Sequence, residues 1–282
     1  MITTYLRPLL CCFAAGTAAL FSAPTQAREA SAWQTDTHSA VRLVAGGRRA
    51  ADAFLRAGVE IQLGHGWKTY WRYPGDSGVP PRFDFAQSVN VKSVNLLWPA
   101  PHRYVDDGGN AIGYKDSVMF PLQVTPQDAA KPVTLRLKLE YAVCERLCLP
   151  AEAQAELLLP TELPAAASAL EAAEGRVPKR SQLGDSAALG IRAVRREAHA
   201  GRDRVVVDIA APGDEPVELF AEGPTPDWAL PLPEPVAPAP AGLRRFAFDL
   251  DGLPPGAVAR GAMLTLTLVA GRTALEVPVH LE

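Results

Sequence analysis

The chain contains few cysteines: four among 282 residues, of which Cys11 and Cys12 lie in an apolar N-terminal stretch. Only Cys144 and Cys148 remain in the rest of the sequence. One such pair is too few for a zinc site built from four cysteines. It also excludes a miniprotein that depends on several disulfides, because a hydrophobic fraction of 48% can fill a core without them.

The sequence also lacks an excess of positive charge and long hydrophobic runs. Its formal net charge is -3 and its isoelectric point is about 6.0, which removes the electrostatic basis for nucleic-acid binding. Beyond residue 27, no run approaches the roughly 20 apolar residues of a membrane-spanning helix. We therefore expect no nucleic-acid partner and no membrane span in the mature chain.

The N-terminus has the pattern of a secretory signal peptide. Arg7 precedes an apolar run over residues 9–21, and the small residues Thr25 and Ala27 indicate cleavage after Ala27. The run is too short to span a bilayer, and Cys11 follows too few apolar residues for a lipoprotein signal. We expect residues 1–27 to be removed during export to an oxidising compartment, where two neighbouring cysteines form a disulfide.

The patterning of the mature chain indicates an all-β protein. Glycine (22) and proline (26) are frequent and interrupt segments in which apolar and polar residues alternate. Such segments occur at residues 41–44, 54–63, 67–73, 91–97, 118–124 and 133–141, and again at 191–194, 204–209, 217–220, 243–250, 263–269 and 275–281. Short strands at this spacing predict antiparallel β-sandwiches.

The mature length of roughly 255 residues favours two domains. We expect a first β-domain over residues 28–160 and a smaller second β-domain over residues 186–282. Residues 161–185 form the linker between them, and 165–174 within it have the composition of a short helix. Residues 231–240 are rich in proline and predict a long loop in the second domain.

The clearest alternation covers residues 67–73 and defines the two faces of one strand. Trp67, Thr69, Trp71 and Tyr73 fall on one face, and Lys68, Tyr70 and Arg72 fall on the other. We expect the tryptophans of the first face to lie in the core, together with Trp98.

The spacing of Cys144 and Cys148 is compatible with three kinds of chemistry. The three residues between them fit a hairpin turn, which brings the Cα atoms to roughly 5–6 Å and permits a disulfide. As a structural cross-link it would contribute only about 2 kcal/mol, because the closed loop is short. Two thiolates could also hold Cu(I), with Met119 or His102 as a further ligand. Exposed disulfides at hairpin tips are easily reduced, so a redox couple is the third alternative.

The neighbouring residues do not decide between these alternatives. Arg146 favours a thiolate and Glu145 opposes it, and no Cys-x-x-Cys motif is present. Asp106 and Asp107 begin an acidic, glycine-containing segment whose simplest interpretation is a solvated turn. Ser77 lacks the strand–turn–helix context of a hydrolase nucleophile.

Four ordered motifs resemble those of one known family. They are GWKTYWRYPGDSGVPP at residues 66–81, WPAP at 98–101, Gly-Tyr at 113–114 and Tyr-x-x-Cys-x-x-x-Cys-x-Pro at 141–150. Residues 53–159, which contain these motifs, resemble the N-terminal periplasmic (alpha) domain of the DsbD family of thiol:disulfide interchange proteins. The resemblance is closer still to the suppressor-of-copper-sensitivity branch of that family.

This resemblance implies a fold and a function. It implies immunoglobulin-like sandwiches in the periplasm, with Cys144 and Cys148 passing electrons between a membrane-fed thioredoxin-like protein and client thiol proteins. Tyr70 matches an active-site tyrosine of the family. Asp106 and Asp107 fall where the family has a cap loop over the cysteines. No cofactor and no metal ion are expected.

The sequence departs from the family in three respects. Gly108 and Gly109 stand where the cap loop has an aromatic residue, and the two cysteines are closer together than in the best-known members. The sequence contains neither a membrane electron carrier nor a thioredoxin-like domain, so a role as a protein-disulfide reductase component requires an electron donor in trans. We therefore expect a thiol–disulfide exchange module. The alternatives are a non-catalytic binding or scaffold protein with a structural disulfide, and a Cu(I)-handling protein.

Overall fold

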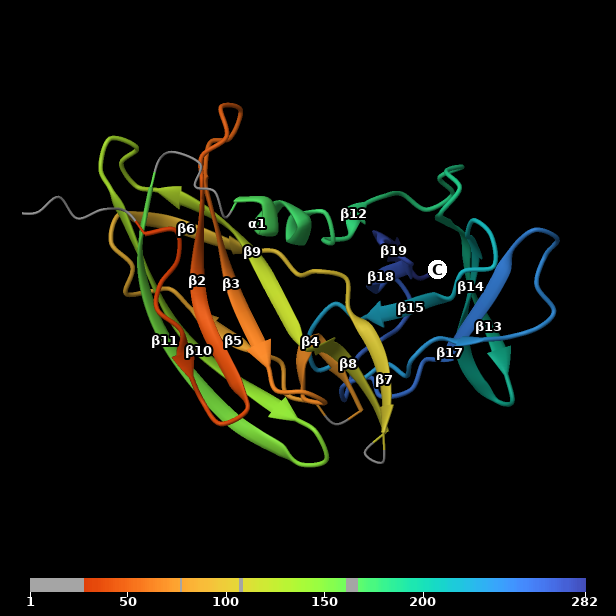
Figure 1. Cartoon of the computed structure of the whole chain (residues 1–282). Helices are drawn as coiled ribbons and strands as arrows, with labels where there is room; N and C mark the ends of the chain where they lie inside the picture. Colours follow the sequence, from red (N-terminus) through yellow and green to blue (C-terminus); the bar gives the residue numbers. More distant parts are fainter. Residues whose placement is uncertain (1–27, 77, 107–108, 161–166) are drawn as a thin grey trace, which may run out of the picture.

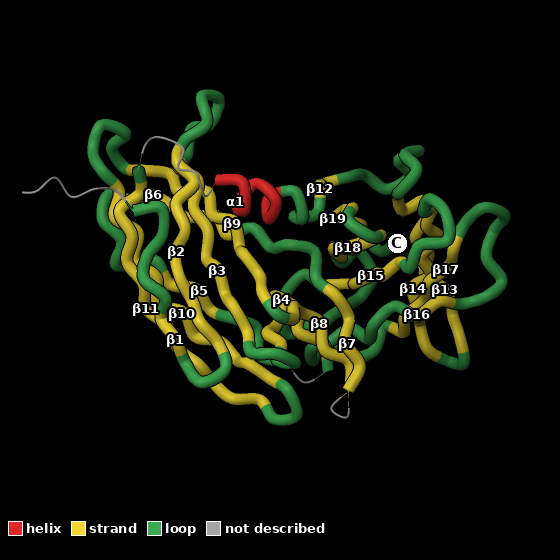
Figure 2. Tube along the Cα trace, viewed as in Figure 1, coloured by secondary structure: helices red, strands yellow, loops and turns green. Residues whose placement is uncertain are grey.

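The computed structural model describes residues 28–76, 78–106, 109–160 and 167–282. The expected signal peptide with its two cysteines, Ser77, Asp107, Gly108 and part of the expected linker therefore lie outside the described residues. Strands make up most of the described chain, and its helix, α1 (Ala167–Glu174), is short (Figure 2). The predicted all-β class is thus confirmed.

Residues 34–159 form two antiparallel sheets that we call the first sandwich (Figure 1). One sheet has the order β1-β2-β3-β9-β6; the other has the order β11-β10-β4-β8-β7, with β5 paired to β10. The first sheet contains β1 (Gln34–Thr35), β2 (Ser39–Gly47), β3 (Leu55–Leu63), β6 (Val91–Leu96) and β9 (Ser117–Pro126). The second contains β4 (Lys68–Gly75), β5 (Arg82–Asp84), β7 (His102–Asp106), β8 (Gly109–Lys115), β10 (Val133–Cys144) and β11 (Cys148–Leu159).

Alternation along the strands builds the core of the first sandwich. In β10, Val133, Leu135, Leu137 and Leu139 are buried, and the residues between them are polar and more exposed. The alternation ends at Tyr141, because the last four residues of β10 are all buried. Both faces of the sheet are therefore covered where β10 reaches Cys144. Trp71 lies in the core as expected, whereas Trp67 and Trp98 are only partly buried against it.

Helix α1 packs against the first sandwich. Leu170 is fully buried, and a Cβ on Gly46 would overlap its side chain. The fully buried Arg56 of β3 donates two hydrogen bonds to the carboxylate of Glu174, each 2.7 Å long. The helix that the sequence assigns to a linker is therefore held by an apolar contact and a bidentate ion pair.

Residues 179–280 form a second pair of sheets, the second sandwich, with orders β12-β19-β18-β15 and β13-β14-β17-β16. The strands are β12 (Lys179–Arg180), β13 (Gly190–His199), β14 (Arg202–Ala210), β15 (Val217–Glu222), β16 (Glu234–Pro235), β17 (Arg244–Asp249), β18 (Met263–Ala270) and β19 (Thr273–His280). It has an apolar core of its own, while its Phe220, Val269 and Ala274 belong to the core cluster of the first sandwich. Asp208 of β14 is buried and binds Arg245 and Arg195, whose hydrogen bonds hold its pKa below the ordinary value against the effect of burial.

The structure departs from several of the expected strand limits. β7 and β8 form a hairpin that the sequence did not predict, because Asp-Asp-Gly-Gly at residues 106–109 indicates only a turn. β13 is longer than the expected 191–194, since its charged half lies at a sheet edge where apolar alternation is not needed. The proline-rich segment 231–240 includes β16, which pairs with β17.

Among the described residues, no helix has the length and apolarity required to cross a bilayer.

The docking of α1 yields a stability prediction. Leu170→Ala should lower the free energy of unfolding by about 2–5 kcal/mol, because it removes a fully buried side chain and leaves a cavity over Gly46. Denaturant unfolding measures this loss. Ala172→Ser, on an exposed position of the same helix, is the control and should cost no more than about 0.5 kcal/mol. Equal losses for the two variants would show that the helix is not docked.

Candidate functional site

The cysteine pair closes the hairpin formed by β10 and β11. Cys144 lies directly opposite Cys148 in the ladder, and the two form a disulfide. Their Cα atoms are 4.2 Å apart, closer than the sequence-based expectation. This separation is near that of directly opposed residues in a non-hydrogen-bonded antiparallel pair, about 4.5 Å. The predicted hairpin is therefore correct, and the strand pairing explains the shorter distance.

The two cysteines differ in their access to solvent. Cys144 has only 2% of its surface exposed, whereas Cys148 is exposed. Cys144 is part of a small buried cluster with Tyr70, Ala111 and Ala142, and Tyr104 packs against this cluster. A thiolate arriving from solvent therefore meets the sulfur of Cys148, while Cys144 is placed to be the leaving group.

Tyr70 of β4 contacts both sulfurs. Its hydroxyl donates a hydrogen bond to Cys144 Sγ at 3.0 Å and lies 3.1 Å from Cys148 Sγ. The sequence correctly placed Tyr70 on the face opposite Trp71, but that face is covered here, and only 2% of the Tyr70 surface is exposed. Burial raises the pKa of the Tyr70 hydroxyl above its ordinary value. The hydroxyl therefore stays protonated at neutral pH and remains a hydrogen-bond donor.

The ring of Tyr70 is packed closely by the segment that follows β4. A Cβ on Gly78 would overlap both the Tyr70 ring and Pro74, so only glycine fits at this position. On the other side, a Cβ on Gly113 of β8 would overlap the backbone around Thr69. Two glycines of the recognised motifs thus allow β8 and the post-β4 segment to approach the tyrosine.

Two lysines extend the row of residues that contains the disulfide. Across the sheet, Cys148 is opposite Cys144, Cys144 is opposite Lys68, and Lys68 is opposite Lys115. Opposed residues of an antiparallel pair lie on the same face, so both lysines share the face of the disulfide. Burial of Lys68 and the charge of Lys115 lower the pKa of Lys68. Cationic groups beside a cysteine favour the thiolate form.

Sequence reasoning missed Lys115 and Tyr104 as site residues, and it singled out Lys68 only as a member of the polar face of its strand. Lys115 Nζ lies 4.5 Å from the centre of the Tyr104 ring, which links the two side chains beside the cysteine cluster. The alternation of apolar and polar residues over 67–73 places Lys68 on the same face as Tyr70, and this signal could have identified Lys68 as a site residue. Nothing local in the sequence brings β7 and β8 next to β4.

The acidic cap segment is only partly described. Asp106 is the last residue of β7, and its backbone pairs with Gly109, while Asp107 lies outside the described residues. The sequence offered no aromatic residue directly after the two aspartates. In the structure the aromatic ring next to the cysteine cluster is that of Tyr104, two residues before Asp106.

The residues weighed as further copper ligands are engaged elsewhere. Met119 lies beside Gly58 of β3, and His102 Nδ1 is 3.0 Å from Glu218 of the second sandwich. Within the described ranges, no group of three or more His, Cys, Asp or Glu side chains is arranged to hold a metal ion.

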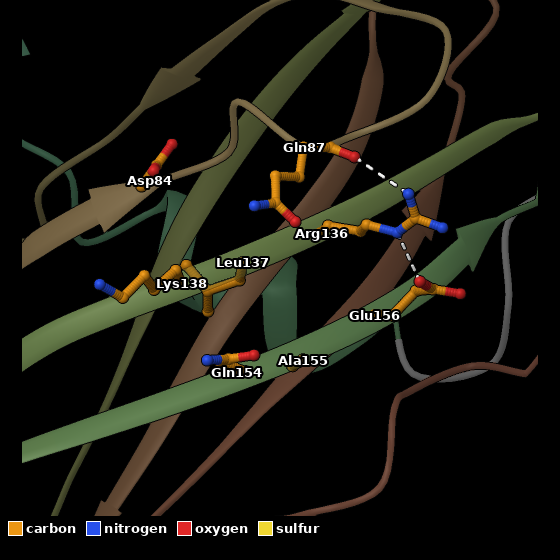
Figure 3. A pocket seen from close by; sticks show the side chains of 8 residues that line it. All are labelled: Asp84, Gln87, Arg136, Leu137, Lys138, Gln154, Ala155 and Glu156. Atoms are coloured by element: carbon orange, nitrogen blue, oxygen red, sulfur yellow. Dashed lines mark hydrogen bonds and ion pairs between the residues drawn. The ribbon is translucent and has the colours of Figure 1, made fainter.

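A pocket of about 370 Å³ lies on the exposed face of β10 and β11, away from the cysteines (Figure 3). Arg136 crosses it, donating to Glu156 at 2.6 Å and to the carbonyl oxygen of Gln87 at 3.2 Å. Arg136 and Glu156 thus neutralise each other, and Arg136 is eight residues from Cys144 along an extended strand. The pocket does not contribute to the disulfide site.

Comparisons with known proteins agree with this geometry. Residues 40–160 match the family described as the N-terminal domain of the thiol:disulfide interchange protein DsbD. The fold is similar to the crystal structure of the N-terminal periplasmic domain of ScsB from Proteus mirabilis, with a TM-score of 0.70 and 22% sequence identity. That similarity covers 90% of this chain and 98% of the other, so it includes the second sandwich. No curated protein sequence matches the chain.

The family match spans the first sandwich, from within β2 to the end of β11, and includes all four sequence motifs and both cysteines. The structural similarity to the ScsB domain shows that the two chains share a fold. Residues 40–160 are therefore similar to the DsbD N-terminal domain family.

Proposed function

We propose that this protein is a periplasmic thiol–disulfide exchange module whose redox couple is Cys144 and Cys148. The observation that carries the proposal is the asymmetry of the disulfide. Cys148 is exposed to an attacking thiolate, Cys144 is buried, and the Tyr70 hydroxyl is within hydrogen-bond distance of both sulfurs. A structural cross-link has no need of this arrangement.

The proposed reaction proceeds in two exchanges. A thiolate of the electron donor attacks Cys148 Sγ, a mixed disulfide forms, the Cys144–Cys148 bond breaks, and Cys144 leaves as a thiolate. The second thiol of the donor loses its proton and attacks the mixed disulfide, releasing the Cys148 thiolate and leaving the donor oxidised. Two electrons thereby reach this protein. The reduced Cys148 then attacks a client disulfide, and Cys144 resolves the new mixed disulfide.

Tyr70 has a specific role in this scheme. Its hydroxyl donates to Cys144 Sγ in the oxidised protein, so the same bond stabilises the negative charge when Cys144 leaves. Hydrogen bonds to charged groups contribute about 1.5–3 kcal/mol, more than neutral ones. Lys68 and Lys115 add positive charge on the same face. Asp106 and Asp107 are retained as supporting residues of the cap segment on the basis of the family resemblance.

The proposed partners rest on the similarity to the DsbD N-terminal family. The electron donor is a thioredoxin-like or membrane electron-transfer protein acting in trans, and the acceptors are periplasmic proteins with disulfides. We further propose that residues 28–160 are the redox domain and residues 186–282 a second β-domain. Most of the intervening residues 161–185 connect them, although α1 packs on the first sandwich and β12 joins the second.

The reduction potential tests the proposed function most directly. We expect a potential more positive than about -300 mV, because a bridge that closes so short a loop gains little from chain entropy. Equilibration with dithiothreitol or glutathione buffers, followed by alkylation and mass spectrometry, measures it. A potential well below about -300 mV would instead support a scaffold protein with a structural disulfide.

Single cysteine variants test which sulfur reacts. Cys144→Ser leaves the exposed Cys148 thiol, and Cys148→Ser leaves the buried Cys144 thiol. We expect Cys148 to react with an aromatic disulfide reagent about tenfold or more faster than Cys144, because only Cys148 is accessible. Release of the coloured thiol gives both rates. Equal rates would contradict the assigned order of attack.

Removing the tyrosine hydroxyl tests its role in exchange. Tyr70→Phe should slow reduction of the disulfide by dithiothreitol about tenfold or more, because the leaving Cys144 thiolate loses its donor. Tyr141→Phe is the matched control, since the Tyr141 hydroxyl is 2.7 Å from that of Ser39 on the opposite face of the sheet. Its rate should stay at the wild-type value. An unchanged rate in Tyr70→Phe would remove Tyr70 from the mechanism.

A further inference from the structure

The pairing of β4, the strand that carries Tyr70, is interrupted directly after this residue. The ladder of β4 with β8 pairs Lys68, Thr69 and Tyr70, and then resumes only at Gly75. The ladder with β10 includes Lys68 alone. In the described structure, residues 71–74 therefore lack ladder partners in the first sandwich, and other contacts must hold them.

The second sandwich supplies those contacts. Arg72 donates to Glu222 of β15 through Nε at 2.7 Å and Nη2 at 2.6 Å, and to Glu276 of β19 at 2.6 Å. Burial alone would lower the pKa of Arg72, but its bonds to both glutamates raise it above the ordinary value. The guanidinium is thus a permanent cation held by two carboxylates of the other sandwich.

The residues on either side of Arg72 make the same connection. The Trp71 ring packs against Phe220 of β15 with ring centres 5.7 Å apart, and the Arg72 guanidinium lies 4.4 Å from the centre of the Trp71 ring. The Tyr73 hydroxyl donates to the carbonyl oxygen of Leu230 at 2.5 Å. Each of the three residues after Tyr70 is therefore bound to the second sandwich.

The strand that carries Tyr104 is held in a similar way. His102 Nδ1 lies 3.0 Å from Glu218, and the backbone N–H of Arg103 donates to the same carboxylate at 2.7 Å. The Arg103 side chain also pairs with Glu234 at 2.7 Å. The next residue, Tyr104, packs against the cluster that buries Cys144. Figure 1 shows β15 of the second sandwich near β4 and β7, to which these hydrogen bonds join it.

The cysteine hairpin itself is not held in this way. Among the described residues, no hydrogen bond or ion pair joins β10 or β11 to residues 179–282. The second sandwich thus binds the residues next to the two tyrosines, whereas the two sulfurs are held within the first sandwich. The distance between the Tyr70 hydroxyl and the sulfurs depends on how the sandwiches are joined.

We infer that the second sandwich positions the redox site, and that Arg72 is the positioning residue that holds Tyr70 against Cys144 and Cys148. This inference rests on the proposed thiol–disulfide exchange. It gives a role to residues 179–282, which lie beyond the matched family segment. Arg72 contacts neither sulfur and acts through the backbone of β4, two residues from Tyr70.

A double-mutant cycle tests this inference. Arg72→Gln should slow reduction of the disulfide by dithiothreitol about threefold to tenfold, because β4 is released and the Tyr70 hydroxyl moves from the sulfurs. In a Tyr70→Phe background, Arg72→Gln should change the rate less than about twofold, since no hydroxyl remains to be positioned. The same slowing factor in both backgrounds, or no slowing in either, would overturn the inference.

The pH dependence of alkylation gives a second readout that a loss of stability would not produce. A hydrogen bond from Tyr70 favours the thiolate, so Arg72→Gln should shift the alkylation profile of the reduced protein to higher pH. Tyr70→Phe should shift it in the same direction. An unshifted profile in Arg72→Gln, together with a shifted one in Tyr70→Phe, would rule out positioning by Arg72.

Matched variants keep the test decisive. Glu222→Gln weakens the same contact from the second sandwich and should slow reduction as well; if Arg72→Gln does not fold, the cycle is run with Glu222→Gln. Arg195→Gln removes an arginine that binds the buried Asp208 within the second sandwich, and its rate should equal that of the wild type. If Tyr70→Phe has no effect, the proposed role of Tyr70 fails. If only Tyr70→Phe has an effect, the positioning inference alone fails.

Discussion

The hydrogen bonds of the Tyr70 hydroxyl to the two sulfurs are the contacts on which this site depends. These hydrogen bonds require the Tyr70 ring to be buried on the outer face of the sheet, which is usually exposed to solvent in sandwich proteins. That face is covered because Tyr104 packs on it and because Gly78 lets the segment after β4 lie against the ring. The same cover buries Cys144 and leaves Cys148 at its rim, and this difference distinguishes the two sulfurs chemically.

One strand, β4, connects three parts of the molecule. Its alternation directs Trp71 into the apolar core and Tyr70 into the cluster with Cys144 on the opposite face. Tyr70 then contacts the disulfide, and Arg72 binds the second sandwich. The positioning inference follows from this short connection, because only two residues of backbone separate the contact with the second sandwich from the cysteine cluster.

Features that depend on neighbouring residues were predicted from the sequence, and features that depend on contacts between distant residues were not. The all-β class, the hairpin between the cysteines and the placement of Tyr70 on the face opposite Trp71 were predicted correctly, because alternation and turn length are local properties. The helix at 167–174 was expected, but not its docking, which needs the glycine at 46 and the buried Arg56. Tyr104 and Lys115 were missed because their closeness to Cys144 depends on the strand order β10-β4-β8-β7.

By itself, the sequence determined that the chain is built from strands, that Cys144 and Cys148 face each other across a hairpin, and that Tyr70 lies on the face opposite Trp71. These features follow from the two-residue period of side chains along a strand and from the three residues that connect Cys144 to Cys148. Only the tertiary structure decided which sulfur is exposed, because the burial of Cys144 comes from other strands of its sheet. It also decided the partners of Arg72, since Glu222 and Glu276 are 150 and 204 residues away along the chain. No local pattern encodes a contact at that separation.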